Sequence, residues 1–333
     1  MAQFLVRRLL YMIVTLFLVS IVSFLIIQLP PGDFLSTVIT KLQQQGQTAD
    51  PAYLASLRAR YALDQPVYQQ YWTWITNILL HGDFGQSFQH GQPVSTLLKQ
   101  RLPLTLTLGI STLLFSWIIA LPAGVYSAVR KYSIGDYAMT VFAFLGIAIP
   151  GFLIALLVAY LEFRYFNNSI GGLFSARYVD AAWNLGKVID LFSHLWLPVV
   201  VLSIGGIGGT VRIFRANLLD ELHKPYVITA RAKGLSERRL LTTYPVRVAL
   251  NPFVSTIGWV LPGLIGGEVI VAKVLSLQTT GPLLLEALQA QDMYLAGSII
   301  LILSALTVVG TLLSDILLGI VDPRIRQAAL KKA

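Results

Sequence analysis

The chain has 333 residues, of which 55% are hydrophobic and only 12% are charged, and its formal net charge is +9. Soluble domains usually carry about 25% charged residues, so this deficit indicates a protein that has lipid as its solvent. A net positive charge can indicate nucleic-acid binding, but basic residues also gather on the cytoplasmic loops of membrane proteins. The sequence contains no cysteine, which excludes disulfides and cysteine metal sites, and its four histidines are scattered.

Long apolar runs predict an all-α integral membrane protein with six transmembrane helices. A helix rises about 1.5 Å per residue, so about 20 apolar residues cross a hydrocarbon core of about 30 Å. The first run is too long for a signal peptide and lacks a small-residue cleavage site, so we expect a retained anchor. Pro122 and Pro150 lie inside two runs and are expected to kink them. The expected spans are residues 9–29, 104–129, 139–161, 195–214, 253–272 and 296–320.

Lys and Arg predict the orientation of these spans, because cytoplasmic loops are enriched in both. If the N-terminus lies inside, most of the 25 basic residues fall on the inner side. Both termini are therefore expected in the cytoplasm. The chain then divides into a tail with the first helix (1–30), a long extracytoplasmic segment (31–102) and a five-helix core (103–333) that contains a basic inner loop near 215–251.

The inner loop has the local signals of two short helices. Pro225 suits the first turn of a helix and Gly234 is placed to end it, while a second helix can begin at Ser236. Val227, Ala230 and Arg231 are expected on one face of the first helix. Such a helix can fit a groove of a cytoplasmic partner, although a solvated basic loop would have the same composition.

Residues 226–235 read Tyr-Val-x-x-Ala-Arg-Ala-Lys-Gly-Leu, which resembles the coupling-loop motif of the dipeptide/oligopeptide family of ABC importer permeases. Ala230 and Gly234 match its two most characteristic positions. The resemblance covers nearly the whole chain and points to the B-type subunit of importers for peptides, nickel or oligosaccharides. Further matching positions follow in the family's order, at residues 4–10, 31–33, 63–66, 71, 74, 82–85, 87, 315 and 322–324.

The resemblance implies a type I ABC importer permease fold in the inner membrane of a prokaryote. Its implied partners are a second homologous permease subunit, two ATP-binding cassette subunits and an extracytoplasmic substrate-binding protein. The chain has no Gly-x-x-x-x-Gly-Lys-Ser/Thr loop, so we expect a non-catalytic subunit without a cofactor, with ATP and Mg²⁺ held by the partner ATPases. The residues implied in coupling to those ATPases are Tyr226, Ala230, Arg231, Lys233, Gly234 and Leu235.

The clearest departure from the family follows the fifth expected span. Similar proteins usually have Glu-x-x-Phe and then Pro-Gly-Leu-Gly there, whereas this chain has Lys-Val-Leu-Ser at residues 273–276 and Thr-Thr-Gly-Pro at residues 279–282. Within that span Gly263 and Gly267 have the spacing of a packing face, and Glu268 is the deepest charge. Glu268 could line the path, reach water or pair with Lys273. The candidates for the translocation path or gate are Gly263, Gly267, Glu268 and Lys273.

The outer segment contains an aromatic stripe at helical spacing. It fits the core of a small domain or an interfacial helix, and in the family this region lies beside the binding protein, so its aromatic residues could form that contact. At the other end of the chain, Asp315 is expected to pair with a basic residue and hold the end of the bundle. The members of the stripe are Tyr68, Tyr71, Trp72, Ile75, Ile78 and Leu79.

Two other functions fit parts of the pattern. A secondary transporter needs buried carboxylates or broken helices at the midplane, but Glu268 and Asp315 both lie near span ends. An intramembrane enzyme needs a nucleophile and a base within spans, and His194 lies only at the edge of one. Neither function explains the motif in the basic loop. We therefore expect an ABC importer permease that carries peptides, with oligosaccharides or a nickel chelate as the alternative cargo.

Overall fold

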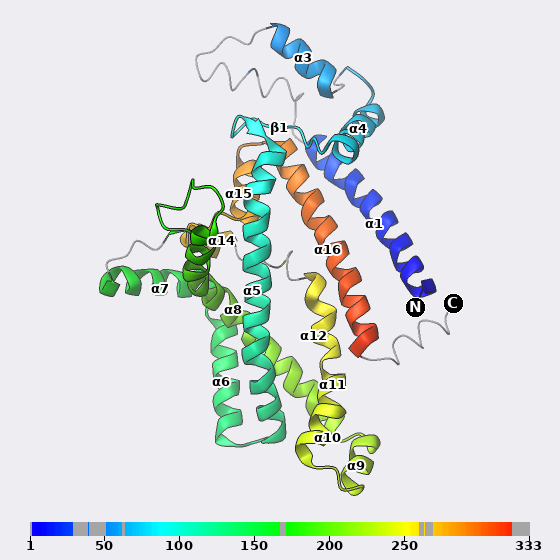
Figure 1. Cartoon of the computed structure of the whole chain (residues 1–333), viewed down its shortest axis with the longest axis vertical. Coiled ribbons are helices and arrows are strands. Elements are labelled where there is room, and N and C mark those ends of the chain that lie inside the picture. Colours follow the sequence, from blue (N-terminus) through cyan, green and yellow to red (C-terminus); the bar gives the residue numbers. More distant parts are fainter. Residues whose placement is uncertain are drawn as a thin grey trace. The chain divides into compact units, whose positions relative to one another are not determined.

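The structure is a computed structural model that describes residues 2–28, 39, 51–61, 64–166, 171–259, 263 and 269–321. These residues are almost entirely helical (Figure 1). The one sheet among them is an antiparallel pair of two-residue strands, in which Gln86 pairs with Pro93 and Ser87 with Gln92. The two strands are β1 (Gln86–Ser87) and β2 (Gln92–Pro93).

Four helices are long and apolar enough to cross a membrane by themselves. Each covers all or nearly all of one predicted run, which confirms the first, second, fourth and last runs as helices. Helices satisfy all their backbone hydrogen bonds internally, so they are stable in lipid. The four helices are α1 (Ala2–Gln28), α5 (Val94–Val129), α8 (Leu185–Leu222) and α16 (Met293–Val321).

The third predicted run is not one straight helix. It forms α6 (Ile134–Ala148) and α7 (Gly151–Phe166), which are bent by 95° at a break between them. Pro150 has no backbone N–H and disfavours helical conformation in the residue before it, and Ile149 is extended, with φ −87° and ψ 121°. The described residues thus hold four candidate spans, or five if the bent pair counts as one.

The fifth predicted run is divided in the structure. It begins with α12 (Asn251–Thr256) and the 3₁₀ turn η2 (Ile257–Trp259) and ends with α14 (Val269–Val274). Residues 260–262 and 264–268 lie outside the described residues. The sixth crossing, and with it the orientation of both termini, therefore stays a prediction.

The chain forms two compact units. Unit 1 holds residues 1–12, 104–282 and 306–333, and unit 2 holds residues 13–103 and 283–305. In unit 1 a large apolar core lies among α5, α7, α8 and α14, with Leu108, Ala155, Leu202 and Val271 among its buried members.

Unit 2 contains most of the segment that follows the first helix. It includes α3 (Pro51–Tyr61), α4 (Val67–Thr76) and the π-helical turn η1 (Asn77–His81). Its core joins side chains from α1, α4 and α16, namely Phe24, Ile27, Tyr71, Trp74, Tyr294 and Leu301.

Asp292, at the start of α16, fastens the strand pair to that helix. Its side chain is buried and accepts hydrogen bonds from Ser87 Oγ at 2.6 Å and from the backbone N–H of Gln89 at 3.0 Å. It also accepts from the N–H of Leu295 at 3.3 Å, so one carboxylate caps α16 and holds the loop between β1 and β2.

Replacing Asp292 with alanine should lower the free energy of unfolding by at least about 2 kcal/mol, because it removes three hydrogen bonds to a carboxylate and even one such bond is worth roughly 1.5–3 kcal/mol. Denaturant or thermal unfolding of the purified chain in detergent measures this change. Asp64→Ala, at an exposed position of the same unit, is the matched control and should alter stability by less than about 0.5 kcal/mol. Equal stability of the two variants would contradict the capping role of Asp292.

Candidate coupling site

The predicted coupling motif forms a short helix at the end of α8. Helix α9 (Pro225–Ala232) is followed by α10 (Glu237–Thr243) and α11 (Pro245–Ala249), and α9 and α10 lie beyond the C-terminal end of α8 (Figure 1). Lys224 is extended, with ψ 145°, and Pro225 occupies the first turn. Both helices predicted in this loop are therefore confirmed.

Gly234 ends α9 in the left-handed conformation, with φ +80°. The N–H of Leu235 donates to the carbonyl of Ala230 at 3.4 Å, and the N–H of Gly234 donates to that of Arg231 at 3.0 Å. This pattern closes a helix C-terminus and favours glycine at the left-handed position. A Cβ at Gly234 would meet nothing within 4 Å, so the glycine is required here for its backbone conformation and not for space.

One face of α9 packs on a small core of its own. Val227 and Leu240 are fully buried, Ala230 is 8% exposed, and Tyr226 and Leu235 pack against them. This core joins α9 to α10. Three of the six predicted coupling residues, Tyr226, Ala230 and Leu235, thus hold the helix in place.

Val227, Ala230 and Arg231 follow helical spacing along α9, as predicted, but the Arg231 side chain is not buried with the other two. It is 48% exposed and pairs with Glu237, with Nε to Oε1 at 2.6 Å and Nη2 to Oε2 at 3.2 Å. The guanidinium group lowers the pKa of the Glu237 carboxyl below its usual value. This exposed pair joins α9 to α10 across the turn at Gly234.

Tyr226 fixes the direction in which α9 leaves α8. Its hydroxyl donates a hydrogen bond to the carboxylate of Glu221, in the last turn of α8. Its ring packs at 6.3 Å, centroid to centroid, from the ring of Tyr244 at the junction of α10 and α11. One side chain therefore connects three consecutive helices.

The outward face of α9 is exposed and carries an apolar residue that the motif did not single out. Ile228 is 56% exposed, and Thr229, Ala232 and Lys233 beside it are exposed as well. This face makes no contact with the small core on the other side of α9, so it is open to a partner. The sequence did give one signal for Ile228. It lies two residues before Ala230 in the coupling-loop motif, at the position where ABC importer permeases in general have Glu.

A buried ion pair connects α8 to α6. Arg215 donates two hydrogen bonds to Asp136, from Nε at 2.8 Å and from Nη2 at 2.7 Å. Asp136 is 2% exposed and also accepts from the hydroxyl of Ser127 and, at 2.9 Å, from the N–H of Tyr132. The turn between α5 and α6 is thereby fixed to α8, about two turns before that helix ends.

Two glycines bring α6 and α8 into close contact. A Cβ on Gly208 would lie 2.3 Å from the carbonyl oxygen of Ala143, and a Cβ on Gly146 would lie 2.8 Å from that of Ile204. Small residues at such crossings let membrane helices approach closely. Gly208 makes the closest of these contacts, whereas its neighbour Gly209 faces open space.

The segment after α9 is also attached to other helices of unit 1. Arg247 of α11 donates to the carbonyls of Val321 at 2.7 Å and of Ile320 at 3.2 Å, which satisfies the end of α16. The Ser314 hydroxyl donates to the carbonyl of Val254. The segment after α9 is therefore hydrogen-bonded to the end of α16.

The pairing predicted for Asp315 is confirmed. Its carboxylate lies 2.7 Å from the guanidinium group of Arg8. The ion pair joins the first turns of α1 to the last part of α16 within unit 1.

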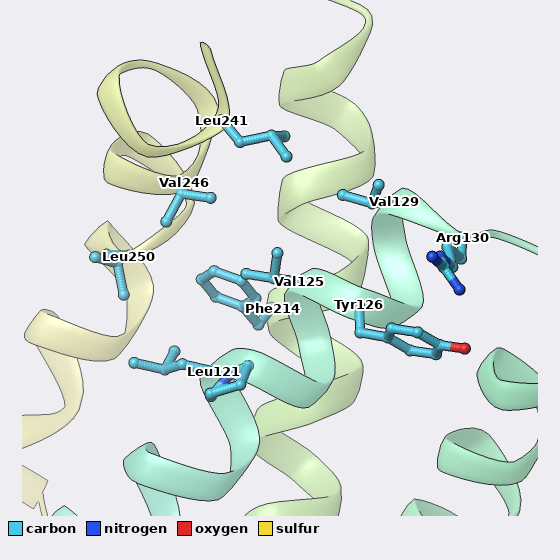
Figure 2. Close-up of a pocket in the computed structure, with 10 residues that line it drawn as sticks. Leu121, Val125, Tyr126, Val129, Arg130, Phe214, Leu241, Val246 and Leu250 are labelled. Carbon is cyan, nitrogen blue, oxygen red and sulfur yellow. The ribbon is translucent and has the colours of Figure 1, made fainter. Parts of the chain in front are cut away.

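An open apolar pocket of about 560 Å³ lies beside Phe214 and is lined by residues of α5, α8, α10 and α11 and by Leu250 (Figure 2). Val125 of α5 and Phe214 of α8 lie at its centre, and Val246 and Leu250 face them from the segment that follows α9. Beside the pocket, α5 and α11 share one apolar core around Phe214, Ala249 and Phe253.

The structure describes two of the four residues predicted for the translocation path. Gly263 faces open space, and Lys273 is exposed on α14. Gly267 and Glu268 lie outside the described residues. Within the described part of the chain, no cluster of three or more His, Asp or Glu residues could hold a metal ion.

Two family models match the chain. Residues 120–327 match the family described as "Binding-protein-dependent transport system inner membrane component", and residues 1–109 match the N-terminal region of the same components. The chain belongs to this family. Its members are non-catalytic permease subunits, so the predicted resemblance and the expectation of a subunit without enzymatic activity are both confirmed. The permease is a membrane protein with several apolar helices that works in a complex with other subunits.

Curated relatives match the permease over almost its whole length. The oligopeptide transport system permease protein AppB of Bacillus subtilis is 36% identical over 98% of this chain and 99% of its own length. OppB of Haemophilus influenzae, an oligopeptide permease, is 30% identical over 98% of this chain and all of its own. DppB of Lactococcus lactis, a dipeptide permease, is 31% identical with the same coverage.

Proposed function

We propose that the chain is the B-type permease subunit of an ABC importer for peptides and forms half of its translocation channel. The names of the relatives, which are oligopeptide and dipeptide permeases, support the choice of cargo. The other half of the channel is a second homologous permease. An extracytoplasmic binding protein delivers the peptide, and two ATP-binding cassette subunits, which hold ATP and Mg²⁺, supply the energy.

The observation that carries this proposal is the exposed outer face of α9. The inner face of the helix is occupied by its own core, so Ile228 and its neighbours are available to a groove on an ATPase subunit. Three contacts, Tyr226 with Glu221, Arg231 with Glu237 and Gly234 in its turn, keep the helix at a fixed angle. A docked helix held in this way moves with its partner.

The connections of α8 determine what moves with α9. Asp136 and Arg215, together with the close glycine contacts, make α6 and α8 a rigid pair. The pocket beside Val125 leaves space into which α10–α11 can shift against α5. Closure of the ATPase dimer would therefore displace α8 with α6 and, through Arg247, the end of α16, and so change which side of the channel is open.

This function sets the topology. The coupling segment faces the cytoplasm, and with six crossings both termini lie on that side, in the inner membrane of a prokaryote. The segment after α1 then lies outside. The excess of Lys and Arg in the coupling segment supports this orientation, because cytoplasmic loops of membrane proteins are enriched in both.

Tyr226→Phe should lower peptide-stimulated ATP hydrolysis, because it keeps the ring packing and removes the hydrogen bond to Glu221. Such a bond to a carboxylate is worth roughly 1.5–3 kcal/mol, so stimulation should fall about tenfold. Tyr244→Phe, which alters the other ring of the same contact, is the matched control and should retain stimulation. If peptide stimulated ATP hydrolysis equally in both variants, the hydrogen bond from the Tyr226 hydroxyl would not be needed for coupling.

Reconstitution tests the function as a whole. The permease, its homologous partner and the two ATPases are placed in liposomes with the binding protein, and uptake of labelled peptide is measured with and without ATP. We expect uptake that requires ATP and is not inhibited by oligosaccharides or a nickel chelate. Uptake driven by an ion gradient through the chain alone would overturn the proposal.

A further inference from the structure

Helix α4 and the turn η1 after it carry no Asp, Glu, Lys or Arg side chain. The chain has none of these four residue types between Asp64 and Asp83. A surface helix of a water-soluble domain usually places charged residues on its outer face. Here the outer face has large apolar and aromatic side chains beside the uncharged polar residues Gln69 and Thr76. Its large side chains, between 54% and 75% exposed, are Val67, Tyr68, Trp72, Leu79 and Leu80.

The opposite face of α4 packs along the last turns of α1. The rings of Tyr71 and Trp74 lie 5.6 Å and 5.7 Å from the ring of Phe24, measured between centroids. The hydroxyl groups of Tyr71 and Ser20 are 2.8 Å apart and hydrogen-bonded in a buried position. These contacts fix the height at which α4 lies against α1.

This height places α4 beside the bilayer. Ser20 precedes Gln28, the end of α1, by eight residues, which is about 12 Å along a helix. The apolar run of α1 from Val6 to Gln28 contains 23 residues, enough to span a hydrocarbon core of about 30 Å. Tyr71 therefore contacts α1 at a level where the helix is surrounded by lipid and not by bulk water.

We propose that α4 and η1 form an interfacial helix that lies in the membrane surface at the C-terminal end of α1. Tyr68, Trp72, Leu79 and Leu80 enter the boundary between lipid headgroups and acyl chains. Tyr and Trp are enriched at this level of membranes, because their rings are apolar and their polar groups reach water.

Two further observations fit this environment. Helix α1 also exposes large apolar side chains, among them Leu18, Val22 and Leu25, in the same unit as α4. The hydroxyl of Thr76 donates to the carbonyl of Trp72 at 2.5 Å, so this exposed side chain satisfies its donor without water. In this arrangement the exposed aromatic residues face lipid and not the binding protein.

The interfacial position has a consequence for unit 2. The helix is anchored to α1 on one side and to the membrane surface on the other, so it holds the end of α1 at a fixed depth. The inference depends on α1 crossing the bilayer and not on peptide import, so the two can fail separately.

Spin labels test the position directly, because the chain has no native cysteine. Tyr68→Cys, Trp72→Cys and Leu80→Cys are made one at a time, labelled with a nitroxide and studied in the assembled transporter in lipid nanodiscs. Collision with oxygen, which concentrates in lipid, is compared with collision with a water-soluble nickel chelate. Ala59→Cys, exposed on α3 next to Arg58, is the matched control in water.

We expect the three α4–η1 labels to collide severalfold more with oxygen, relative to nickel, than the Ala59 label. Binding protein added in excess should not change their spectra. Nickel accessibility equal to that of the Ala59 label would overturn the proposal, since the face would then be in water. Immobile labels that neither reagent reaches would also overturn it, since a protein partner would then cover the face. If Trp72→Cys does not assemble, the oxygen-to-nickel collision ratios of the labels at Tyr68 and Leu80 decide the test.

Discussion

Gly234→Val should reduce ATP-dependent peptide uptake about tenfold or more while the protein still inserts and assembles. Gly234 has φ +80°, and a left-handed residue other than glycine costs roughly 1–2 kcal/mol, with a larger cost for a β-branched one. The small core beneath α9 has three buried side chains and cannot absorb this strain. The turn then opens, and the angle of α9 is no longer fixed. Uptake into proteoliposomes at equal amounts of assembled complex measures the effect.

Gly234→Asn is the matched control, because asparagine tolerates the left-handed conformation. A Cβ at this position meets no atom within 4 Å, so the chain itself leaves room for the side chain. Retained uptake with Asn and lost uptake with Val would assign the effect to backbone conformation. Full activity of the Val variant would show that the geometry of the turn does not matter for coupling.

Asp136→Ala should destabilise the protein by about 3 kcal/mol, because it leaves the guanidinium group of Arg215 without its partner. This loss of stability is at the lower end of the range for breaking a buried ion pair, because the Arg215 side chain is 26% exposed to solvent. Unfolding of the purified protein in mixed detergent measures the change. Peptide uptake should fall as well, because α6 no longer follows α8.

The double variant Asp136→Leu with Arg215→Met separates these two effects. Apolar replacement of both partners of a buried ion pair is often neutral or stabilising. We expect stability near that of the natural protein, with coupling intact if α6 and α8 still pack through Gly208 and Gly146. If the double variant lost as much stability as Asp136→Ala, the ion pair itself would stabilise the protein, and the unpaired arginine would not explain the loss.

Local signals in the sequence predicted α9 well. Pro225 and Gly234 act on the residues next to them, so the start and the end of the helix follow from backbone preferences alone. The exposed ion pair of Arg231 was not predicted, because its partner Glu237 lies six residues away on another helix. Ile228 was missed because only the packing of α10 against Val227 and Ala230 shows which face of α9 remains open.

Hydropathy predicted where apolar helices occur, and Pro150 predicted a kink in the run at residues 139–161. The structure confirms this kink as a bend of 95° at the extended Ile149, but its size did not follow from the sequence. In the outer segment, Trp72 belongs to the exposed face and Trp74 to the buried one, although both lie in the same aromatic stretch. Helical spacing places the two residues on different faces of α4, but only the packing of α4 on α1 shows which face is buried.

Contacts between distant parts of the chain could not be derived from one sequence. Arg215 and Asp136 are separated by 79 residues, and nothing in either local pattern connects them. The same holds for Asp292, which acts on Ser87 205 residues away. Asp315 is the exception, since a single charge near the end of an apolar span predicts a basic partner, and the structure supplies Arg8.

The central claim is that energy enters this permease through the exposed face of α9. Ile228→Cys, in a chain without native cysteine, can be cross-linked in the assembled transporter and the product identified by mass. The account predicts a cross-link to an ATPase subunit that stops peptide uptake, while Gln69→Cys, exposed on α4, gives no such product. The account would be contradicted if Ile228→Cys gave no cross-link to an ATPase subunit, or if it cross-linked to the binding protein instead.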